Sequence, residues 1–253
     1  MSIFDNIKAI AFDLDGTIYF GEKLADDVHQ LLAILQSKKI QVYYFTNNSS
    51  KTKKQIYDKL IRLGLELGFR DVYNSSYTST VYAKSRNFKK IFCCGTQDLK
   101  DQFMSEGLEI AESNEIVDAI FIGLDTSFNY QKMAEILAVI KKSNCQLIAC
   151  NIDKNYPIEN NLIMPGCGSI VAAIENCSER KVDFIVGKPN SYMLELLMKD
   201  HNITKDQIMV VGDSYMSDIA MAKSLGCKSI LISQNDSDVT TIRSIKDLVS
   251  LIN

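Results

Sequence analysis

The chain has 253 residues, of which 46% are hydrophobic and 23% charged, the composition of an ordinary globular protein. At this length it can bury a substantial core, as one large domain or as two smaller ones. The net charge of -3 at pH 7 argues against a nucleic-acid-binding protein, because binding a phosphate backbone needs clustered positive charge.

Short apolar runs alternate with longer amphipathic runs along the chain. The apolar runs predict strands at 7–12, 41–45, 90–94, 118–122, 146–150, 183–186, 207–211 and 229–232. The amphipathic runs predict helices at 26–37, 52–63, 130–142, 169–176, 191–200, 216–225 and 245–251. This alternation is typical of a doubly wound parallel sheet, so we expect an α/β fold.

The distribution of special residues excludes several other classes of protein. The N-terminal segment has no basic region leading into an uninterrupted apolar stretch, so we expect no signal peptide. No apolar run approaches membrane-spanning length, and we expect no membrane partner. The seven cysteines form no C-x-x-C pair and the chain has only two histidines. We therefore expect free thiols in a cytoplasmic protein, with chemistry that rests on oxygen ligands and lysine.

Four of the predicted strands end in polar residues. Their ends read DLDGT (13–17), TNNSS (46–50), GKP (187–189) and GDSYMSD (212–218). Each alone is compatible with a plain turn or a helix N-cap, and for D-x-D-G alone that interpretation is favoured by roughly ten to one. Ligands bind beyond the carboxyl ends of parallel strands, so we expect the four segments to converge on one crevice.

The combination of residues at these ends suits phosphoryl transfer. Asp13 and Asp213 can supply carboxylate ligands to Mg²⁺ from neighbouring strands. One carboxylate can act as a nucleophile, and a second carboxyl can protonate the leaving oxygen. Lys188 supplies positive charge for the phosphoryl oxygens, and Thr46 and Asn47 supply neutral donors.

These four motifs resemble those of the haloacid dehalogenase superfamily of phosphohydrolases, in particular subfamily IIA, the NagD-like and 4-nitrophenylphosphatase-like group. The segments IGLDTSFNY, CNIDKNYP and MPGCGSIVAAIE resemble the cap domain of that subfamily, so the resemblance covers essentially the whole chain. It implies a Rossmann-like catalytic core at 1–78 and 180–253, with an α/β cap domain for substrate specificity inserted at 79–179. Ser217 replaces the usual threonine, and its role is left open.

The resemblance also implies a role for each motif residue. Asp13 is expected to be the nucleophile and a Mg²⁺ ligand. Asp15 is expected to be the general acid/base, with its backbone carbonyl also on the metal. Thr46 and Asn47 are expected to hold the transferring phosphoryl group, while Lys188 offsets its charge and orients Asp13.

Four further residues complete the expected site. Asp213 is the expected second metal carboxylate, and Asp218 is expected to ligate the metal or position a metal-bound water. Asn151 and Asp153 end a predicted cap strand and are candidates to contact the leaving group. A plain strand-to-loop turn is an equally good interpretation of these two residues.

We thus expect a Mg²⁺-dependent phosphatase that hydrolyses small phosphorylated metabolites, such as nucleoside monophosphates or sugar phosphates, through an aspartyl-phosphate. The alternatives are a receiver-like signalling module, which would need a long-lived aspartyl-phosphate and no acid/base at Asp15, and an inactive binding protein on the same fold. We expect a monomer or a homodimer, and the sequence leaves the natural substrate open.

Overall fold

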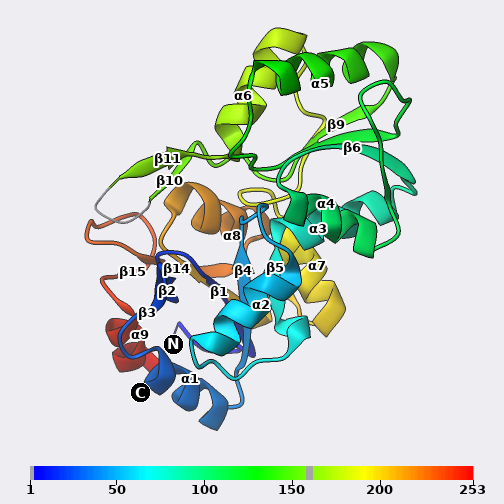
Figure 1. The fold of residues 1–253 in the computed structure, drawn as a ribbon. Helices are drawn as coiled ribbons and strands as arrows, with labels where there is room; N and C mark the ends of the chain where they lie inside the picture. Colours follow the sequence, from blue (N-terminus) through cyan, green and yellow to red (C-terminus); the bar gives the residue numbers. More distant parts are fainter. Residues whose placement is uncertain (1–2, 158–161, 253) are drawn as a thin grey trace. The chain divides into compact units, whose positions relative to one another are not determined.

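We analysed a computed structural model of the chain, which describes residues 3–157 and 162–252. The chain divides into two compact units, each formed from separate segments. Unit 1 comprises Met1–Thr46, Tyr57–Tyr73 and Lys188–Asn253, and unit 2 comprises Asn47–Ile56 and Asn74–Gly187. Each unit is built on a largely parallel sheet with helices (Figure 1), which confirms the predicted α/β class.

Unit 1 contains a six-stranded sheet in the order β15-β14-β13-β1-β4-β5. The strands are β1 (Ala9–Asp13), β4 (Gln41–Thr46), β5 (Val72–Asn74), β13 (Ile208–Gly212), β14 (Lys228–Ile232) and β15 (Thr241–Ile242). β1 pairs in parallel with β13 on one side and with β4 on the other. All five residues of β1 are buried, as expected for the central strand of a sheet that is covered on both faces.

The remaining elements of unit 1 connect and cover this sheet. The helices are α1 (Val28–Ser37), α2 (Lys53–Arg62), α7 (Tyr192–His201), α8 (Ala220–Leu225) and α9 (Ile245–Ile252), of which α2 begins in unit 2. α1 packs against α9. A two-stranded hairpin, β2 (Tyr19–Phe20) and β3 (Lys23–Leu24), follows β1, and a π-helical turn at Tyr215–Ile219 precedes α8.

Unit 2 contains a five-stranded parallel sheet in the order β12-β9-β8-β6-β7. The strands are β6 (Lys90–Cys94), β7 (Glu109–Ile110), β8 (Ala119–Ile122), β9 (Gln146–Ala149) and β12 (Phe184–Ile185). The helices are α3 (Ser75–Ser85), α4 (Gln97–Ser105), α5 (Tyr130–Lys142) and α6 (Cys167–Ser178). An antiparallel hairpin, β10 (Asn155–Pro157) and β11 (Ile163–Pro165), completes the unit.

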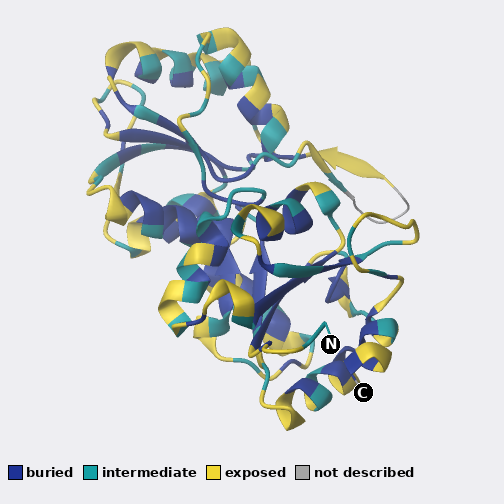
Figure 2. Cartoon of the chain, turned by 180° about the vertical axis from the view of Figure 1, so that it is seen from behind, coloured by how far each residue is buried: buried dark blue, intermediate teal, exposed yellow. Residues whose placement is uncertain are grey.

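The helices of unit 2 cover both faces of its sheet, α5 and α6 on one face and α3 and α4 on the other (Figure 1). The first face carries a continuous apolar cluster that includes Ile120, Ile136 and Ile170. On the second face the Phe103 ring of α4 contacts the Phe121 ring of β8 at 4.8 Å between centroids. The three central strands, β6, β8 and β9, are accordingly mostly buried in Figure 2, while the outer faces of the helices are exposed.

Each predicted strand and helix overlaps an element of the structure, but one expectation about their arrangement is wrong. The strand before Lys188, β12, does not belong to the sheet that contains β1, β4 and β13. It pairs with β9 in unit 2, with Phe184 beside Ile148. An apolar run in the sequence predicts a buried strand but carries no information about which of two sheets it joins.

The unit boundaries fall at 46/47, 56/57, 73/74 and 187/188. The expected boundaries between core and cap were 78/79 and 179/180. The assignment of these segments to a catalytic core and a cap stays a prediction.

Candidate active site

Three aspartates of unit 1 come together at the carboxyl ends of two neighbouring strands. Asp13 is the last residue of β1, Asp213 directly follows β13, and Asp218 lies in the π-helical turn. Each offers one carboxylate oxygen, and these atoms lie within 4.8 Å of one another. Asp13 and Asp218 are buried, whereas Asp213 is an exposed residue. β1 lies between β4 and β13, the kind of switch point at which open parallel sheets bind ligands.

Two glycines make room for these carboxylates. Gly16 has a φ of 88°, and a β-carbon on it would lie 2.8 Å from Cγ of Asp213. A β-carbon on Gly212 would lie 2.7 Å from the β-carbon of Asp218. Both contacts are shorter than van der Waals distance, so any side chain at either position would displace the carboxylate beside it.

The turn after β13 is held by its own polar groups. The backbone N–H of Ser214 donates to Oδ2 of Asp218 at 3.0 Å, and the backbone N–H of Asp218 donates to the Ser214 carbonyl at 2.9 Å. The backbone N–H of Ser217 donates to Oγ of Ser214 at 3.3 Å. These bonds fix the other carboxylate oxygen of Asp218, Oδ1, on the side of the cluster.

Lys188 joins two of the three carboxylates. Its Nζ donates to Oδ1 of Asp13 and, at 2.7 Å, to Oδ1 of Asp218. The lysine is only 2% exposed, and its ammonium lies 4.6 Å from the centroid of the Phe45 ring. The structure therefore brings Lys188 to the aspartates as expected, although it follows a strand of the other sheet.

The electrostatics of this cluster reflect buried negative charge. Burial raises the pKa of Asp13 well above its usual value, against the attraction of Lys188 and with the repulsion of Asp218 and Asp213. Desolvation, followed by repulsion from Asp218, raises the pKa of Asp213 to about 6. Burial alone would lower the pKa of Lys188, but the charges of Asp13 and Asp218 outweigh burial and raise it.

Asp15 lies in a different environment from Asp13. The Tyr19 hydroxyl donates to Oδ2 of Asp15 at 3.2 Å, and Oγ1 of Thr46 makes a longer bond of 3.5 Å to the same oxygen. Tyr19 is only 1% exposed, and Nζ of Lys59 lies 3.9 Å from its ring centroid. Sequence reasoning did not single out Tyr19. The available signal was an aromatic hydroxyl four residues after Asp15, across a turn that contains glycine.

The remaining predicted residues, Asn47, Asn151 and Asp153, lie in unit 2, where they contact one another. The Asn47 amide donates to the Asp153 carboxylate, and the Asn151 amide donates to the Asn47 carbonyl. The expected roles of Asn151 and Asp153 in contacting the leaving group stay predictions.

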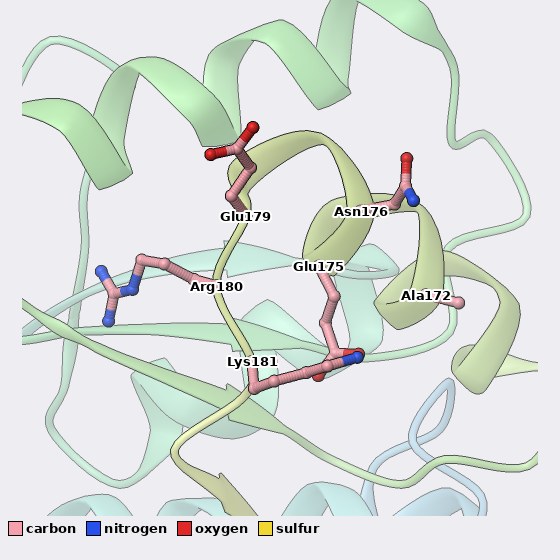
Figure 3. Close-up of a pocket in the computed structure, with 6 residues that line it drawn as sticks. All are labelled: Ala172, Glu175, Asn176, Glu179, Arg180 and Lys181. Atoms are coloured by element: carbon pink, nitrogen blue, oxygen red, sulfur yellow. The ribbon is translucent and has the colours of Figure 1, made fainter.

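A surface pocket of about 380 Å³ lies at the C-terminal end of α6 in unit 2 (Figure 3). Three of its four charged side chains, those of Glu175, Arg180 and Lys181, form ion pairs. Lys181 contacts Glu175 at 2.8 Å, and Arg180 contacts Asp183 at 3.3 Å. None of the predicted site residues lines this pocket, and we assign it no role.

In the described part of the chain, no helix is sufficiently long and apolar to span a bilayer.

The fold and the site define an α/β protein with an acidic, lysine-containing centre at the switch point of a parallel sheet. A family model described as haloacid dehalogenase-like hydrolase matches residues 7–226, and the chain belongs to this family. The resemblance seen in the four motifs is thereby confirmed.

Individual relatives narrow the position within the family. The chain is 30% identical over 254 residues to phosphoglycolate phosphatase 2 of Arabidopsis thaliana, with 91% of this chain and 84% of that protein covered. It superimposes on a 4-nitrophenylphosphatase from Thermotoga maritima with a TM-score of 0.92 and 26% identity, over 100% of both chains. A structure described as a putative nagD protein gives a TM-score of 0.90 and 27% identity, over 97% of this chain and 98% of that one. The structural neighbours are thus of the NagD and 4-nitrophenylphosphatase type, as the resemblance to subfamily IIA predicted.

Proposed function

We propose that this protein is a phosphoric monoester hydrolase that acts on small phosphorylated metabolites and uses Asp13 as its nucleophile. The observation that carries the proposal is the surroundings of Asp13 at the end of the central strand. Lys188 holds its carboxylate, and Asp213 and Asp218 lie beside it. Asp15, two residues further on, is held separately by the Tyr19 hydroxyl. Two of the relatives, a phosphoglycolate phosphatase and a 4-nitrophenylphosphatase, are named for the hydrolysis of small phosphate esters, which supports the same activity.

The donor set fits a magnesium ion. The three clustered side chains supply only carboxylate oxygens, the ligands that this hard cation prefers. Among the described residues, a single ammonium, that of Lys188, faces the three carboxylates, so the ionised cluster carries excess negative charge. Burial and the repulsion between the carboxylates raise the pKa values of Asp13 and Asp213. Asp13, Asp213 and Asp218 would hold the ion, together with the expected backbone carbonyl of Asp15. When bound, Mg²⁺ offsets this charge and polarises a phosphoryl oxygen.

The residues of unit 1 account for both steps of the reaction. A carboxylate oxygen of Asp13 bonds to phosphorus while the ester P–O bond breaks, and Asp15 gives a proton to the departing oxygen. Water then attacks phosphorus and gives a proton to Asp15. The bond between phosphorus and Asp13 breaks, which releases inorganic phosphate and restores Asp13. Lys188 stabilises the charge on the transferring group and orients Asp13.

The environments of the two aspartates support this division of roles. Asp13 is 6% exposed, and burial raises its pKa, but the ammonium of Lys188 bonds to the charged, nucleophilic form and favours it against burial. Asp15 is exposed and bonded to hydroxyls, so it can exchange a proton with a leaving group or with water. Two carboxyl groups in contrasting surroundings are a common arrangement for a base or nucleophile beside an acid.

The test is release of phosphate from 4-nitrophenyl phosphate, with Mg²⁺ and after its removal by a chelator. Wild type should turn over only with the metal, and Asp13→Asn should be slower by about a thousandfold or more. Asp238→Asn, which changes an exposed aspartate of unit 1, is the matched control and should keep wild-type activity. Equal rates for wild type and Asp13→Asn would refute the proposal.

An acid-quench experiment separates hydrolysis from signalling. A hydrolase forms an aspartyl-phosphate that turns over within the catalytic cycle. A phosphoenzyme that persists for minutes after the substrate is exhausted would favour the receiver-like alternative instead.

Two further expectations stay proposals. We propose a cytoplasmic location, because all seven cysteines are unpaired, which suits a reducing compartment. The choice between monomer and homodimer, and the identity of the natural phosphate ester, stay predictions for solution measurements and a substrate panel.

A further inference from the structure

A chain of hydrogen bonds ties Asn47 to the segment that follows β9 in unit 2. Nδ2 of Asn47 lies 3.0 Å from each carboxylate oxygen of Asp153. Nδ2 of Asn151 donates to the backbone carbonyl of Asn47 at 2.7 Å. Asn47 is thus held at its side chain by one residue and at its main chain by another.

The two holding residues are themselves fixed. The backbone N–H of Asp153 donates to Oδ1 of Asn151 at 3.1 Å, which closes a turn between them. Asn151 is 3% exposed, and its Nδ2 also lies 3.4 Å from Oγ of Ser49. That hydroxyl accepts the backbone N–H of Leu124 at 2.9 Å. The holding segment is therefore anchored to the end of a second strand, β8.

The contacts also determine which way the Asn47 amide faces. A carboxylate only accepts hydrogen bonds, so Nδ2 of Asn47 must face Asp153 and Oδ1 must face the other way. Oδ1 lies against Gly187, where a β-carbon would be 2.6 Å from it. The same β-carbon would be 2.6 Å from the Cys150 carbonyl. Glycine at 187 is thus required for this orientation of Asn47.

The carboxylate of Asp153 is a stronger hydrogen-bond acceptor than is required to satisfy the Asn47 amide. A neutral acceptor would satisfy one amide N–H, whereas a hydrogen bond to a carboxylate is stronger and polarises the donor. Both carboxylate oxygens of Asp153 lie at the same distance from Nδ2 of Asn47, so they share one N–H of the amide. The nitrogen carries a second hydrogen, whose direction the carboxylate also fixes.

We propose that Asn151 and Asp153 are positioning residues that orient Asn47 for the phosphoryl group, rather than residues that read the leaving group. This inference rests on the proposed function and on the expected role of Asn47 as one of the donors to the phosphoryl group. All phosphate monoesters share that group. Loss of the positioning contacts therefore weakens binding of every substrate, and of inorganic phosphate, by the same factor.

The test measures phosphate affinity and turnover in the full-length protein with Mg²⁺ present. Calorimetric titration with inorganic phosphate measures the affinity for the phosphoryl group without requiring turnover. Asp153→Ala should weaken phosphate binding by about tenfold, the effect of losing one charge-assisted hydrogen bond. Asp153→Asn keeps one acceptor oxygen and should lose less. Asp101→Ala, which changes an exposed aspartate of α4, is the matched control and should bind phosphate as wild type does.

Steady-state kinetics with an aryl and an alkyl phosphate show whether Asp153 positions Asn47 or contacts the leaving group directly. Asp153→Ala should raise KM for both esters by the same factor as it weakens phosphate binding, with a smaller change in kcat. Unchanged phosphate affinity would overturn the inference, as would a ratio of kcat/KM between the two esters that shifts more than about fivefold. Absence of turnover by wild type would refute the proposed function alone, because the phosphate titration still decides the role of Asp153.

Discussion

Gly16 and Asp213 approach so closely that no side chain fits between them. A β-carbon on Gly16 would lie 2.8 Å from Cγ of Asp213, and Gly16 has a φ of 88°, in the left-handed region that favours glycine. Gly16 therefore allows the turn after β1 and also leaves space for the Asp213 carboxylate after β13. The glycine of the D-x-D-G motif is thus required both for its own turn and to leave room for the side chain of Asp213.

We predict that Gly16→Ala lowers the affinity of the site for Mg²⁺. The added methyl group must displace the Asp213 carboxylate, and the backbone strain costs about 1 kcal/mol of stability. The Mg²⁺ concentration that supports half-maximal turnover should rise about tenfold, the equivalent of one weakened ligand. Gly107→Ala is the matched control, because Gly107 has a φ of 85° but no neighbour within 4 Å. An equal effect of both substitutions on the Mg²⁺ requirement would contradict the steric role of Gly16.

We predict that Lys188→Met destabilises the metal-free protein by about 3–5 kcal/mol, because it leaves Asp13 and Asp218 buried without their ammonium. Added Mg²⁺ should recover part of this loss, while turnover stays low. Thermal or urea unfolding with and without metal measures the effect. Lys223→Met breaks an exposed pair with Asp238 and should cost no more than about 1 kcal/mol. Similar losses for the two variants would contradict the buried pairing of Lys188.

We predict that the metal-free protein loses stability between about pH 4 and pH 6. The pKa of Asp213 is raised from 3.8 to about 6 in the folded protein. The folded state therefore holds this proton more tightly than the unfolded state does. The resulting stabilisation is present at low pH and is lost as the pH rises through the folded pKa. In a chelator, Tm of Asp213→Asn should exceed that of wild type by more at pH 7 than at pH 4.5. A Tm difference that is independent of pH would be inconsistent with the raised pKa.

We predict that Tyr19→Phe impairs the transfer of a proton to the leaving group. Without the Tyr19 hydroxyl, only the long contact of Thr46 holds Oδ2 of Asp15 among the described hydrogen bonds. An alkyl phosphate needs protonation of its leaving oxygen more than 4-nitrophenyl phosphate does, since nitrophenolate is a better leaving group. The value of kcat/KM should fall about tenfold for the alkyl ester and about twofold for the aryl ester. Tyr57→Phe, in the same unit, is the control, and equal losses for both esters would argue against the role of Tyr19.

Much of unit 1 was predictable because its chemistry lies at strand ends. The apolar runs before Asp13 and Asp213 predict buried strands, and parallel strands bring their carboxyl ends to one edge. The pairing of β1 with β13 confirms the expectation that these two residues lie on neighbouring strands. The clustering of Lys188 with them was also expected, but the strand that leads to it lies in the other sheet.

Helix α3 (Ser75–Ser85) was not predicted, and the reason is its polarity. Five of its residues are buried Ser or Thr, namely Ser75, Ser76, Thr78, Ser79 and Thr80. Their hydroxyls replace the apolar face that periodicity detects. Ser75, for example, donates to the Cys150 carbonyl at 3.0 Å, and Thr78 donates to the Asn74 carbonyl at 2.9 Å. A pattern method that scores hydrophobicity has no signal from such a helix.

The contact between Asn47 and Asp153 was not predictable either. The two residues are 106 positions apart, and each lies in a segment that reads as an ordinary turn or helix cap. The two segments meet only in the folded unit 2, to which both residues belong. The sequence indicated both residues, but with different roles: Asn47 was expected to hold the phosphoryl group and Asp153 to contact the leaving group.

The path of the chain has a practical consequence for recombining this protein with its relatives. Two of the four crossings between the units fall at the bonds Thr46–Asn47 and Gly187–Lys188, inside two of the signature motifs. A swap of unit 2 that is joined at these bonds would graft a foreign Asn47 and Gly187 beside a native Thr46 and Lys188. Chimaeras should instead carry each of these motifs whole from one parent. The two units therefore cannot be exchanged independently of each other, because each of these two motifs contributes residues to both units.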